Sequence, residues 1–448
     1  MAKKTMVIAT IGLLVLAGIG VTANWLIHRK TPDVHHGLTA PFVTSSVSRA
    51  TTSQTGPGKR GNSPSSKYGQ PWAFYGRTLD RTRNDSNDRV VHPPFRTVWS
   101  KDGGGSLEYP PSYANGMLFE ATNSGVVTAF DVFNGKEDWR HRFFNSVVGT
   151  PAIAGRLIYL PCYDGRLYAL YSRTGKTAWA RFIGGMIEGS PAVWKGRVYE
   201  GSVSGSMRAF NATTGRPLWR FTTAGAVKHG PAIVGERLYF GDYAGYVYCL
   251  NARTGTLIWR THTAGLASGF GSGSFYATPA VAYGRVYISN TDGKVYSLVA
   301  SNGSIAWTHT FPAWAYGSPA VSEGRVFATA WDGSVAALSA RTGSAIWTHR
   351  LPNRTLASPV VIGNLVYIAD RGPVANGRGE VFAFGVRNGR QVWHFSDGKY
   401  SSVIAAAGRL IVTGIDRLYA LEPKNASTNR TSAPRHPASN SKNANSRS

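Results

Sequence analysis

Hydrophobic and polar residues alternate with a period of two through most of this chain, and glycine-containing turns interrupt the alternation every eight to ten residues. Residues 191–223 show the pattern clearly, because four short alternating runs follow one another there. Such alternation is typical of β-strands, and the short turns between the runs predict an antiparallel meander. The four predicted strands are 191–194, 198–202, 207–210 and 217–220.

The same unit recurs along the chain. Most copies of the fourth strand contain a tryptophan. A glycine precedes this tryptophan by a few residues, and a proline with small apolar neighbours follows the tryptophan by eleven or twelve residues. A four-stranded unit with a period near 40 residues predicts the blade of a β-propeller. The tryptophans that mark the fourth strand are Trp99, Trp139, Trp179, Trp219, Trp259, Trp307, Trp347 and Trp393.

The number of units predicts how the ring closes. Seven full units extend over about 110–396, and an eighth, 401–421, lacks its tryptophan strand. Residues 95–99 form an isolated fourth strand at the other end, and pairing the two leaves no free sheet edge at the ends of the ring. We therefore predict an all-β fold, an eight-bladed propeller of four-stranded antiparallel blades, with the tryptophans packed between blades.

The unit at 165–182, GRLYALYSRTGKTAWARF, resembles the repeat of the pyrroloquinoline quinone (PQQ)-like propellers. That family includes quinoprotein alcohol dehydrogenases and the propeller lipoprotein of the outer-membrane β-barrel assembly machinery. Residues 71–85, PWAFYGRTLDRTRND, resemble the lead-in that often precedes such propellers. The resemblance covers about 71–422 and implies the fold. The resemblance does not identify the function, because this repeat occurs in both enzymes and non-catalytic scaffolds.

The N-terminus carries an uncharged, mostly apolar run, residues 6–27, between basic residues on both sides. As a helix this run is about 33 Å long, enough to cross a hydrocarbon core of about 30 Å. A cleaved signal peptide ending near 21–23 is the alternative. The length of the run favours an uncleaved anchor over 1–30, and either outcome exports the main domain.

The remaining segments and the composition complete the domain plan. Residues 31–70 and 424–448 are low-complexity stretches, predicted to be a disordered linker and a basic disordered tail, so that the propeller spans 71–423. With 52 glycines and only 16% charged residues, an all-helical protein is excluded, and 42% hydrophobic residues exclude wholesale disorder. Two cysteines exclude a disulfide framework or a four-cysteine zinc site.

Strand order places the connections between blades, and the turns between second and third strands, on one face of the ring, called here the upper face. Two insertions, 264–276 and 371–378, also emerge there. Long loops on a rigid ring are where binding residues are usually found, although ordinary solvated loops are the alternative. The candidate residues for a ligand or partner are Glu188, Lys228, His229, Tyr276, Trp314, Tyr316, Arg354, Lys399 and Tyr400.

The resemblance also implies an enzyme as the alternative. A quinoprotein dehydrogenase needs adjacent cysteines against PQQ, and a Ca²⁺ usually takes more than one carboxylate. Cys162 and Cys249 lie two blades apart, and Glu188 is the one central carboxylate of the upper loops. We therefore predict no catalytic residues and neither PQQ nor Ca²⁺ as cofactor. No shared metal site is expected from three histidines that lie on fourth strands of different blades: His141, His309 and His349.

Charge suggests a second surface. The formal net charge is +26, and within 71–422 there are 36 basic and 22 acidic residues. Turns on the lower face repeat a basic residue after glycine, which is either a tolerated turn pattern or a surface that docks on anionic lipid or an acidic envelope polymer. The candidate residues for that surface are Arg156, Arg197, Arg237, Arg285, Arg325 and Arg409.

These observations favour a single-pass membrane protein with a monomeric propeller on the periplasmic or extracellular side. We expect it to act as a non-catalytic scaffold that binds envelope proteins or an anionic envelope surface, and not nucleic acid. A PQQ-dependent dehydrogenase is the first alternative. An extracytoplasmic sensor is the second, and it needs a partner chain because only five residues precede the apolar run.

Overall fold

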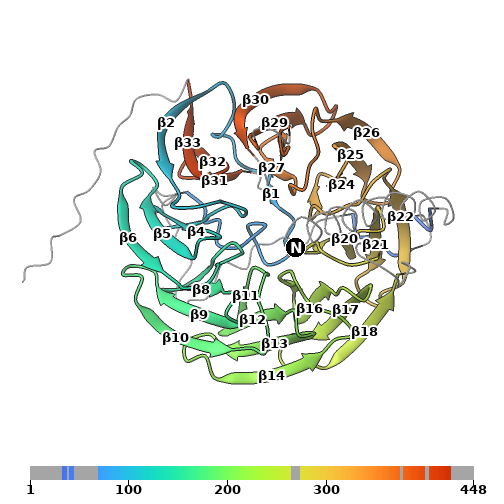
Figure 1. Ribbon diagram of the computed structural model, residues 1–448. Helices are drawn as coiled ribbons and strands as arrows, with labels where there is room; N and C mark the ends of the chain where they lie inside the picture. Colours follow the sequence, from blue (N-terminus) through green and yellow to red (C-terminus); the bar gives the residue numbers. More distant parts are fainter. Residues whose placement is uncertain are drawn as a thin grey trace, which may run out of the picture.

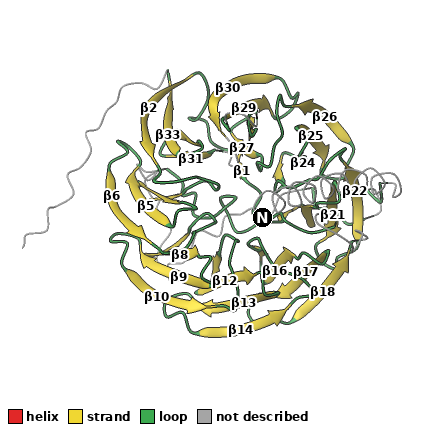
Figure 2. Ribbon diagram, in the orientation of Figure 1, coloured by secondary structure: helices red, strands yellow, loops and turns green. Residues whose placement is uncertain are grey.

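The computed structural model describes residues 33–37, 40–44, 69–263, 273–373, 377–398 and 403–424. These residues form a closed ring of eight antiparallel blades, in which the regular elements are strands (Figures 1 and 2). The predicted eight-bladed, all-β propeller is confirmed. None of the described residues belongs to a helix long and apolar enough to cross a bilayer, and the apolar run 6–27 lies outside them.

In each blade the first strand lies nearest the axis and the fourth at the rim (Figure 1). Blades 1 to 4 contain β3 (Ser112–Ala114), β4 (Met117–Ala121), β5 (Val126–Asp131) and β6 (Glu137–Arg142); β7 (Ala152–Ala154), β8 (Leu157–Pro161), β9 (Arg166–Tyr171) and β10 (Thr177–Phe182); β11 (Ala192–Trp194), β12 (Arg197–Ser202), β13 (Ser206–Asn211) and β14 (Pro217–Thr222); β15 (Ala232–Val234), β16 (Arg237–Gly241), β17 (Tyr246–Asn251) and β18 (Leu257–His262).

Blades 5 to 8 repeat this order, with two changes near the ends of the ring. Blade 7 gains a short parallel strand, β1 (Asn84–Asp85), and blade 8 takes its fourth strand, β2 (Phe95–Asp102), from the start of the propeller. The other strands are β19 (Ala280–Ala282), β20 (Arg285–Ser289), β21 (Lys294–Val299) and β22 (Ile305–Thr310); β23 (Ala320–Ser322), β24 (Arg325–Thr329), β25 (Ser334–Ser339) and β26 (Ala345–Arg350); β27 (Val360–Ile362), β28 (Leu365–Ala369), β29 (Gly379–Gly385) and β30 (Gln391–Gly398); β31 (Ile404–Ala406), β32 (Arg409–Thr413) and β33 (Arg417–Pro423).

The seam of the ring lies in blade 8, where β2 pairs antiparallel with β33 and Trp99 lies opposite Ala420. The indole N–H of Trp99 donates to the carbonyl of Val132 in blade 1, and the ring packs on Gly135. A Cβ at Gly135 would lie 2.8 Å from that ring. Trp99 therefore packs between neighbouring blades, as predicted, and its contact with the turn glycine of the next blade was not predicted.

The lead-in segment, residues 71–85, passes through the centre of the ring. Trp72 exchanges two backbone hydrogen bonds of 2.9 Å with Tyr113 in blade 1, and β1 pairs with β27 in blade 7. In between, inner-strand amides of several blades donate to successive lead-in carbonyls over 2.7–2.9 Å: Ile153 to Ala73, Ile233 to Leu79, Val281 to Asp80, Val321 to Thr82 and Val361 to Arg83. The segment therefore joins blades on opposite sides of the axis.

The backbone of the lead-in explains how one short segment reaches so many blades. Arg81 and Arg83 adopt left-handed conformations, with φ of 58° and 52°. Such conformations are uncommon for residues other than glycine and they turn the chain. These two turns bend the segment around the axis. Its successive carbonyls therefore face the inner strands of different blades.

Part of the predicted disordered linker lies on the ring. The docked segment consists of residues 33–37 and 40–44. Residues 33–37 run along the outer edge of β22, where His35 forms an isolated antiparallel bridge with Trp307, and residues 40–44 lie against Tyr283 and Arg285. Asp33 accepts a hydrogen bond of 2.6 Å from the hydroxyl of Thr310. For these residues the expected free linker is replaced by an isolated bridge and a few backbone hydrogen bonds, because β22 offers unpaired backbone groups at the rim.

Candidate functional site

Four of the predicted upper-face residues occupy the same position of the repeat, in the connection that leads into each blade. The residue three before the conserved proline is Glu188 in blade 3, Lys228 in blade 4, Tyr276 in blade 5 and Tyr316 in blade 6. The repeat geometry therefore brings residues about 40 positions apart in sequence to neighbouring places around the axis.

Six of the nine predicted upper-face residues form one chain of contacts, and a seventh, Arg354, joins them through Trp331. These seven are called the upper-mouth cluster (Glu188, Lys228, His229, Tyr276, Trp314, Tyr316, Arg354). Its members touch in this order: Lys228 Nζ lies 3.2 Å from a Glu188 carboxylate oxygen and 5.7 Å from the centre of the Tyr276 ring; the ring centres of His229 and Tyr276 are 4.7 Å apart, those of Tyr276 and Tyr316 5.4 Å, and those of Tyr316 and Trp314 5.9 Å; Arg354 lies 5.4 Å over Trp331, next to Trp314. Lys399 and Tyr400 lie outside the described residues.

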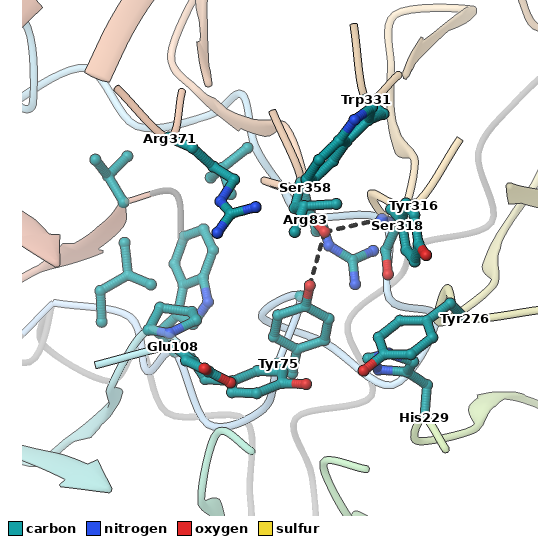
Figure 3. Close-up of a pocket in the computed structure, with 18 of the residues that line it drawn as sticks. Tyr75, Arg83, Glu108, His229, Tyr276, Tyr316, Ser318, Trp331, Ser358 and Arg371 are labelled. Atoms are coloured by element: carbon teal, nitrogen blue, oxygen red, sulfur yellow. Dashed lines mark hydrogen bonds between the residues drawn. The ribbon is translucent and has the colours of Figure 1, made fainter. Parts of the chain in front are cut away.

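Beneath this cluster lies a cavity of about 410 Å³, with the lead-in segment as part of its wall. Figure 3 shows Tyr75 and Arg83 near the middle of the lining residues, with Tyr316, Tyr276 and His229 on one side of them. The Tyr75 hydroxyl and the Ser358 hydroxyl are hydrogen-bonded over 2.7 Å. A cavity of this size, with aromatic walls and a few convergent polar groups, is typical of a site for a small molecule.

Two buried arginines lie at the base of the site, and they differ in their partners. Arg81 is fully buried and donates to the backbone carbonyls of Tyr75, Ser190, Pro191 and Pro231. Arg83 is 1% exposed; its Nη1 donates to the carbonyls of Arg81 and Pro319, and the Tyr75 side chain lies against the guanidinium and favours its charged form. Within the described residues, its Nε and Nη2 have no hydrogen-bond partner.

Burial determines the protonation of this site. It lowers the pKa of Arg81 to about 9, which leaves Arg81 cationic near neutral pH, and it also lowers the pKa of Arg83, whose charged form Tyr75 favours. Burial, together with the charges of Arg83 and Lys228, lowers the pKa of His229 to about 3. His229 is therefore a neutral imidazole, and its buried Nε2 has no partner among the described residues.

The residues that sequence reasoning missed come mainly from outside the repeat. Trp72, Tyr75 and Arg83 belong to the lead-in, and the residue patterns of the blades contain no signal for a segment that enters the axis. Glu108 was open to prediction, because it occupies the same repeat position in blade 1 as Glu188 in blade 3. Arg371, which lies 5.2 Å over Trp331, follows an aspartate turn at the start of an insertion.

The residues of this site do not fit PQQ with its calcium ion. Cys162 and Cys249 are separate, buried, free thiols in blades 2 and 4, so no pair of adjacent cysteines is available. Among the described residues, no three His, Cys, Asp or Glu side chains gather as metal ligands. The three histidines considered above lie on β6, β22 and β26; His141 and His349 contact the backbone carbonyls of Gly175 and Gly389 in the next blade.

The lower face differs from the expected row of free arginines. Arg285 is fully buried, because the docked segment covers it and accepts its hydrogen bonds through the carbonyls of Ala40 and Pro41. Arg237 donates to the carbonyl of Ala300, and Arg409 donates to that of Val132, in each case across a blade boundary. Arg285 is therefore not available to an anionic surface, and these two others connect blades.

The other three basic candidates remain at the lower face. Arg156 is exposed and lies 5.5 Å over the Tyr171 ring, whereas Arg197 and Arg325 are half-buried and donate to carbonyls within their own turns. Acidic side chains also occur there, since Glu236 and Glu323 pair with the nearby arginines Arg253 and Arg387. The lower face is therefore less uniformly basic than predicted.

Comparison with solved structures shows the fold. The chain is similar to BamB from Moraxella catarrhalis, with 18% identity and a TM-score of 0.63 over 74% of this chain and 99% of that chain. It is also similar to the quinohemoprotein alcohol dehydrogenase from Comamonas testosteroni, with 15% identity and a TM-score of 0.67 over 79% of this chain and 80% of that one. A europium-containing methanol dehydrogenase gives 12% identity and a TM-score of 0.67, over 79% and 98%.

Among curated proteins, no sequence relative matches this chain. A family model described as outer membrane protein assembly factor BamB matches residues 91–201, 203–288 and 244–435. These ranges cover well over half of the 448 residues. The chain therefore belongs to the outer membrane protein assembly factor BamB family of PQQ-like propellers.

Proposed function

We propose that this protein is a membrane-anchored, exported propeller that binds a partner or ligand at its upper mouth and does not catalyse a reaction. The observation that carries the proposal is the upper-mouth cluster above a cavity of about 410 Å³. Aromatic side chains and one paired charge, Lys228 with Glu188, give such a surface large contact area with few unpaired groups.

Family membership supports an envelope role. The family model is described as an outer membrane protein assembly factor, and we take that description as support for a role in which this chain contacts other proteins. The apolar run 6–27 is long enough for an anchor that keeps the ring at the membrane. In this proposal the partners are envelope proteins, and the lower face has a structural role.

The location is tested with the full chain in its own cells. We expect it in the membrane fraction, and a variant without residues 1–30 should leave that fraction. Recovery of the full chain among soluble cytoplasmic proteins would contradict the proposal.

The binding face is tested by photo-crosslinking in intact membranes. A crosslinkable amino acid at Tyr276 should give a discrete protein adduct, and one at Arg156, on the lower face, should not. A second substitution, Lys228→Ala, should weaken the Tyr276 adduct. Adducts formed only from Arg156 would instead assign the partner to the lower face.

The two alternatives have their own assays. For a PQQ-dependent dehydrogenase, purified protein with added PQQ and Ca²⁺ should reduce a dye when an alcohol is supplied, and we expect no turnover. For a sensor, the adduct at Tyr276 should contain a membrane protein with a cytoplasmic output domain. Tight PQQ binding with turnover would replace the scaffold proposal.

A further inference from the structure

We propose that the axial cavity binds an organic anion, an aromatic carboxylate, and that Arg83 of the lead-in takes the charge of its carboxylate. The inference deepens the proposed function, since it names the class of ligand at the upper mouth. It rests on one unusual feature, a buried cation in which two of the three guanidinium nitrogens have no hydrogen-bond partner among the described residues.

Arg83 and Arg81 have nearly the same burial, but only in Arg83 do guanidinium nitrogens lack any hydrogen-bond partner among the described residues. Its Nε and Nη2 are unpaired among the described residues, while Nη1 binds two carbonyls of the scaffold. Nε and Nη2 lie along one edge of the planar guanidinium, and this edge matches the two oxygens of a carboxylate. The carbonyl contacts therefore hold Arg83 in place and leave its carboxylate-binding edge unused.

Leaving that edge unpaired has a cost. A buried donor without a partner is destabilising, and more so when it is charged. Arg83 also holds a left-handed backbone conformation, with φ of 52°. Strain and unpaired polar groups of this kind are found together at binding sites. A bound carboxylate supplies the missing hydrogen bonds.

The other charged groups of the cavity favour a single negative charge. Arg371 also lines the cavity, and Glu108 is a carboxylate in the same wall. In Figure 3, Glu108 and Arg83 lie on different sides of the cavity. Lys228 is paired with Glu188, and His229 is neutral, so two arginines and one glutamate set the local charge.

The walls select the rest of the ligand. Trp72, Tyr109, Tyr276, Trp314 and Trp331 line the cavity and offer aromatic faces and edges. Stacking and edge contacts with a flat aromatic ring are favourable at such walls. Tyr75 is the exception, because its ring lies 4.4 Å from the Arg83 guanidinium and covers it. The ligand therefore displaces this ring, which its hydroxyl contact with Ser358 otherwise holds.

The test compares three probes by titration calorimetry on the full chain in neutral-lipid nanodiscs, with empty nanodiscs as blank. The probes are 2-naphthoate, its neutral analogue 2-naphthamide, and acetate, which lacks the aromatic body. We expect naphthoate to bind at least about tenfold more tightly than either other probe, which corresponds to about 1.4 kcal/mol.

The variants assign the charge preference to one residue. Arg83→Met should abolish the preference for naphthoate over naphthamide, and Arg83→Lys should reduce it, because an ammonium lacks the planar fork. Arg89→Met is the matched control. It removes one positive charge from an exposed residue outside the cavity lining, and it should keep the preference. Tyr75→Ala should bind naphthoate more tightly than the unmodified chain.

Equal binding of naphthoate and naphthamide by the unmodified chain would overturn the proposal, and so would undetectable binding of naphthoate. This comparison needs no variant, so it decides the question even if Arg83→Met does not fold. Retention of the preference in a folded Arg83→Met protein would also overturn it. These outcomes leave the crosslinking result at Tyr276 unaffected, so failure of the ligand class and failure of the proposed scaffold role are distinguishable.

Discussion

The two sides of the lead-in segment differ in how completely their polar groups are paired. Around Arg81, four backbone carbonyls from the lead-in and from blades 3 and 4 accept its hydrogen bonds. Around Arg83, two carbonyls accept bonds from Nη1, and one edge of the guanidinium stays unpaired. The two residues are two positions apart, equally buried, and both left-handed.

Hydrogen-bond pairing therefore distinguishes a structural arginine from a ligand-binding arginine better than burial does. A buried arginine with all its donors paired connects the elements around it, and its removal leaves several carbonyls without partners. A buried arginine with unpaired donors costs stability unless something else binds it. The ring is therefore held together on the Arg81 side and open to a ligand on the Arg83 side.

The largest expected effect comes from exchanging each arginine for methionine. Arg81→Met leaves four buried carbonyls unpaired at about 1–3 kcal/mol each, so we expect a loss on the order of 5 kcal/mol. Arg83→Met should cost far less, because it also removes an incompletely paired buried charge. Thermal melts of the two variants measure this difference. Equal destabilisation would show that pairing does not distinguish the two sides.

The seam of the ring gives the next largest effect. Trp99→Ala removes a buried indole, its hydrogen bond to Val132 and its packing on Gly135, and should cost about 3–5 kcal/mol. Phe144→Ala is the control, since Phe144 is fully exposed and its loss should change little. Deleting 94–100 should destabilise the whole ring. A wild-type melting temperature for that deletion would mean that the ring does not depend on the β2–β33 pairing.

A buried carboxyl near Arg81 makes the stability depend on pH. Burial raises the pKa of Glu200 from 4.5 to about 8, although the nearby Arg81 opposes the shift. The unfolded chain therefore ionises this group first, and the folded state loses stability as pH rises from about 4.5 to about 8. Glu200→Gln should match the unmodified protein at pH 5 and melt at a higher temperature at pH 9.

Melting curves at both pH values check this prediction. The comparison with Glu200→Gln cancels the contributions of other groups, such as His229, whose lowered pKa acts in the opposite direction below about 6.5. A stabilisation of Glu200→Gln that is larger at pH 5 than at pH 9 would contradict the predicted direction.

The repeated part of the fold was predictable because every blade uses the same strand order and the same packing and turn residues. Tryptophan, glycine and proline recur at fixed positions, so the fold, the blade count and the seam at Trp99 follow from spacing alone. The same repetition predicted the upper-mouth cluster, since residues at one repeat position gather around one axis. These predictions required no knowledge of side-chain orientation.

The central part of the site was not predictable in this way. Arg83 and Tyr75 occur once, in a segment whose path depends on left-handed backbone positions and on carbonyl contacts with many blades. The burial of Arg285 was missed for a similar reason, because a low-complexity segment covers it. Segments outside the repeat have no copies from which their positions can be inferred.

The docked segment is a weaker attachment than the lead-in, and its effect should be local. The amide of Thr308 in β22 donates to the carbonyl of Val34, and Trp307 is fully buried beneath the segment. The equivalent strand β26 has nearly the same sequence, but no docked segment lies beside it within the described part of the chain. Hydrogen exchange should therefore show slower exchange at the amide of Thr308 than at the amide of Thr348.

Deleting 33–44 should remove this difference and lower the free energy of unfolding by only about 1–2 kcal/mol, the contribution of a few partly exposed hydrogen bonds. Unchanged protection of Thr308 after the deletion would show that the docked segment does not pair with β22 in solution.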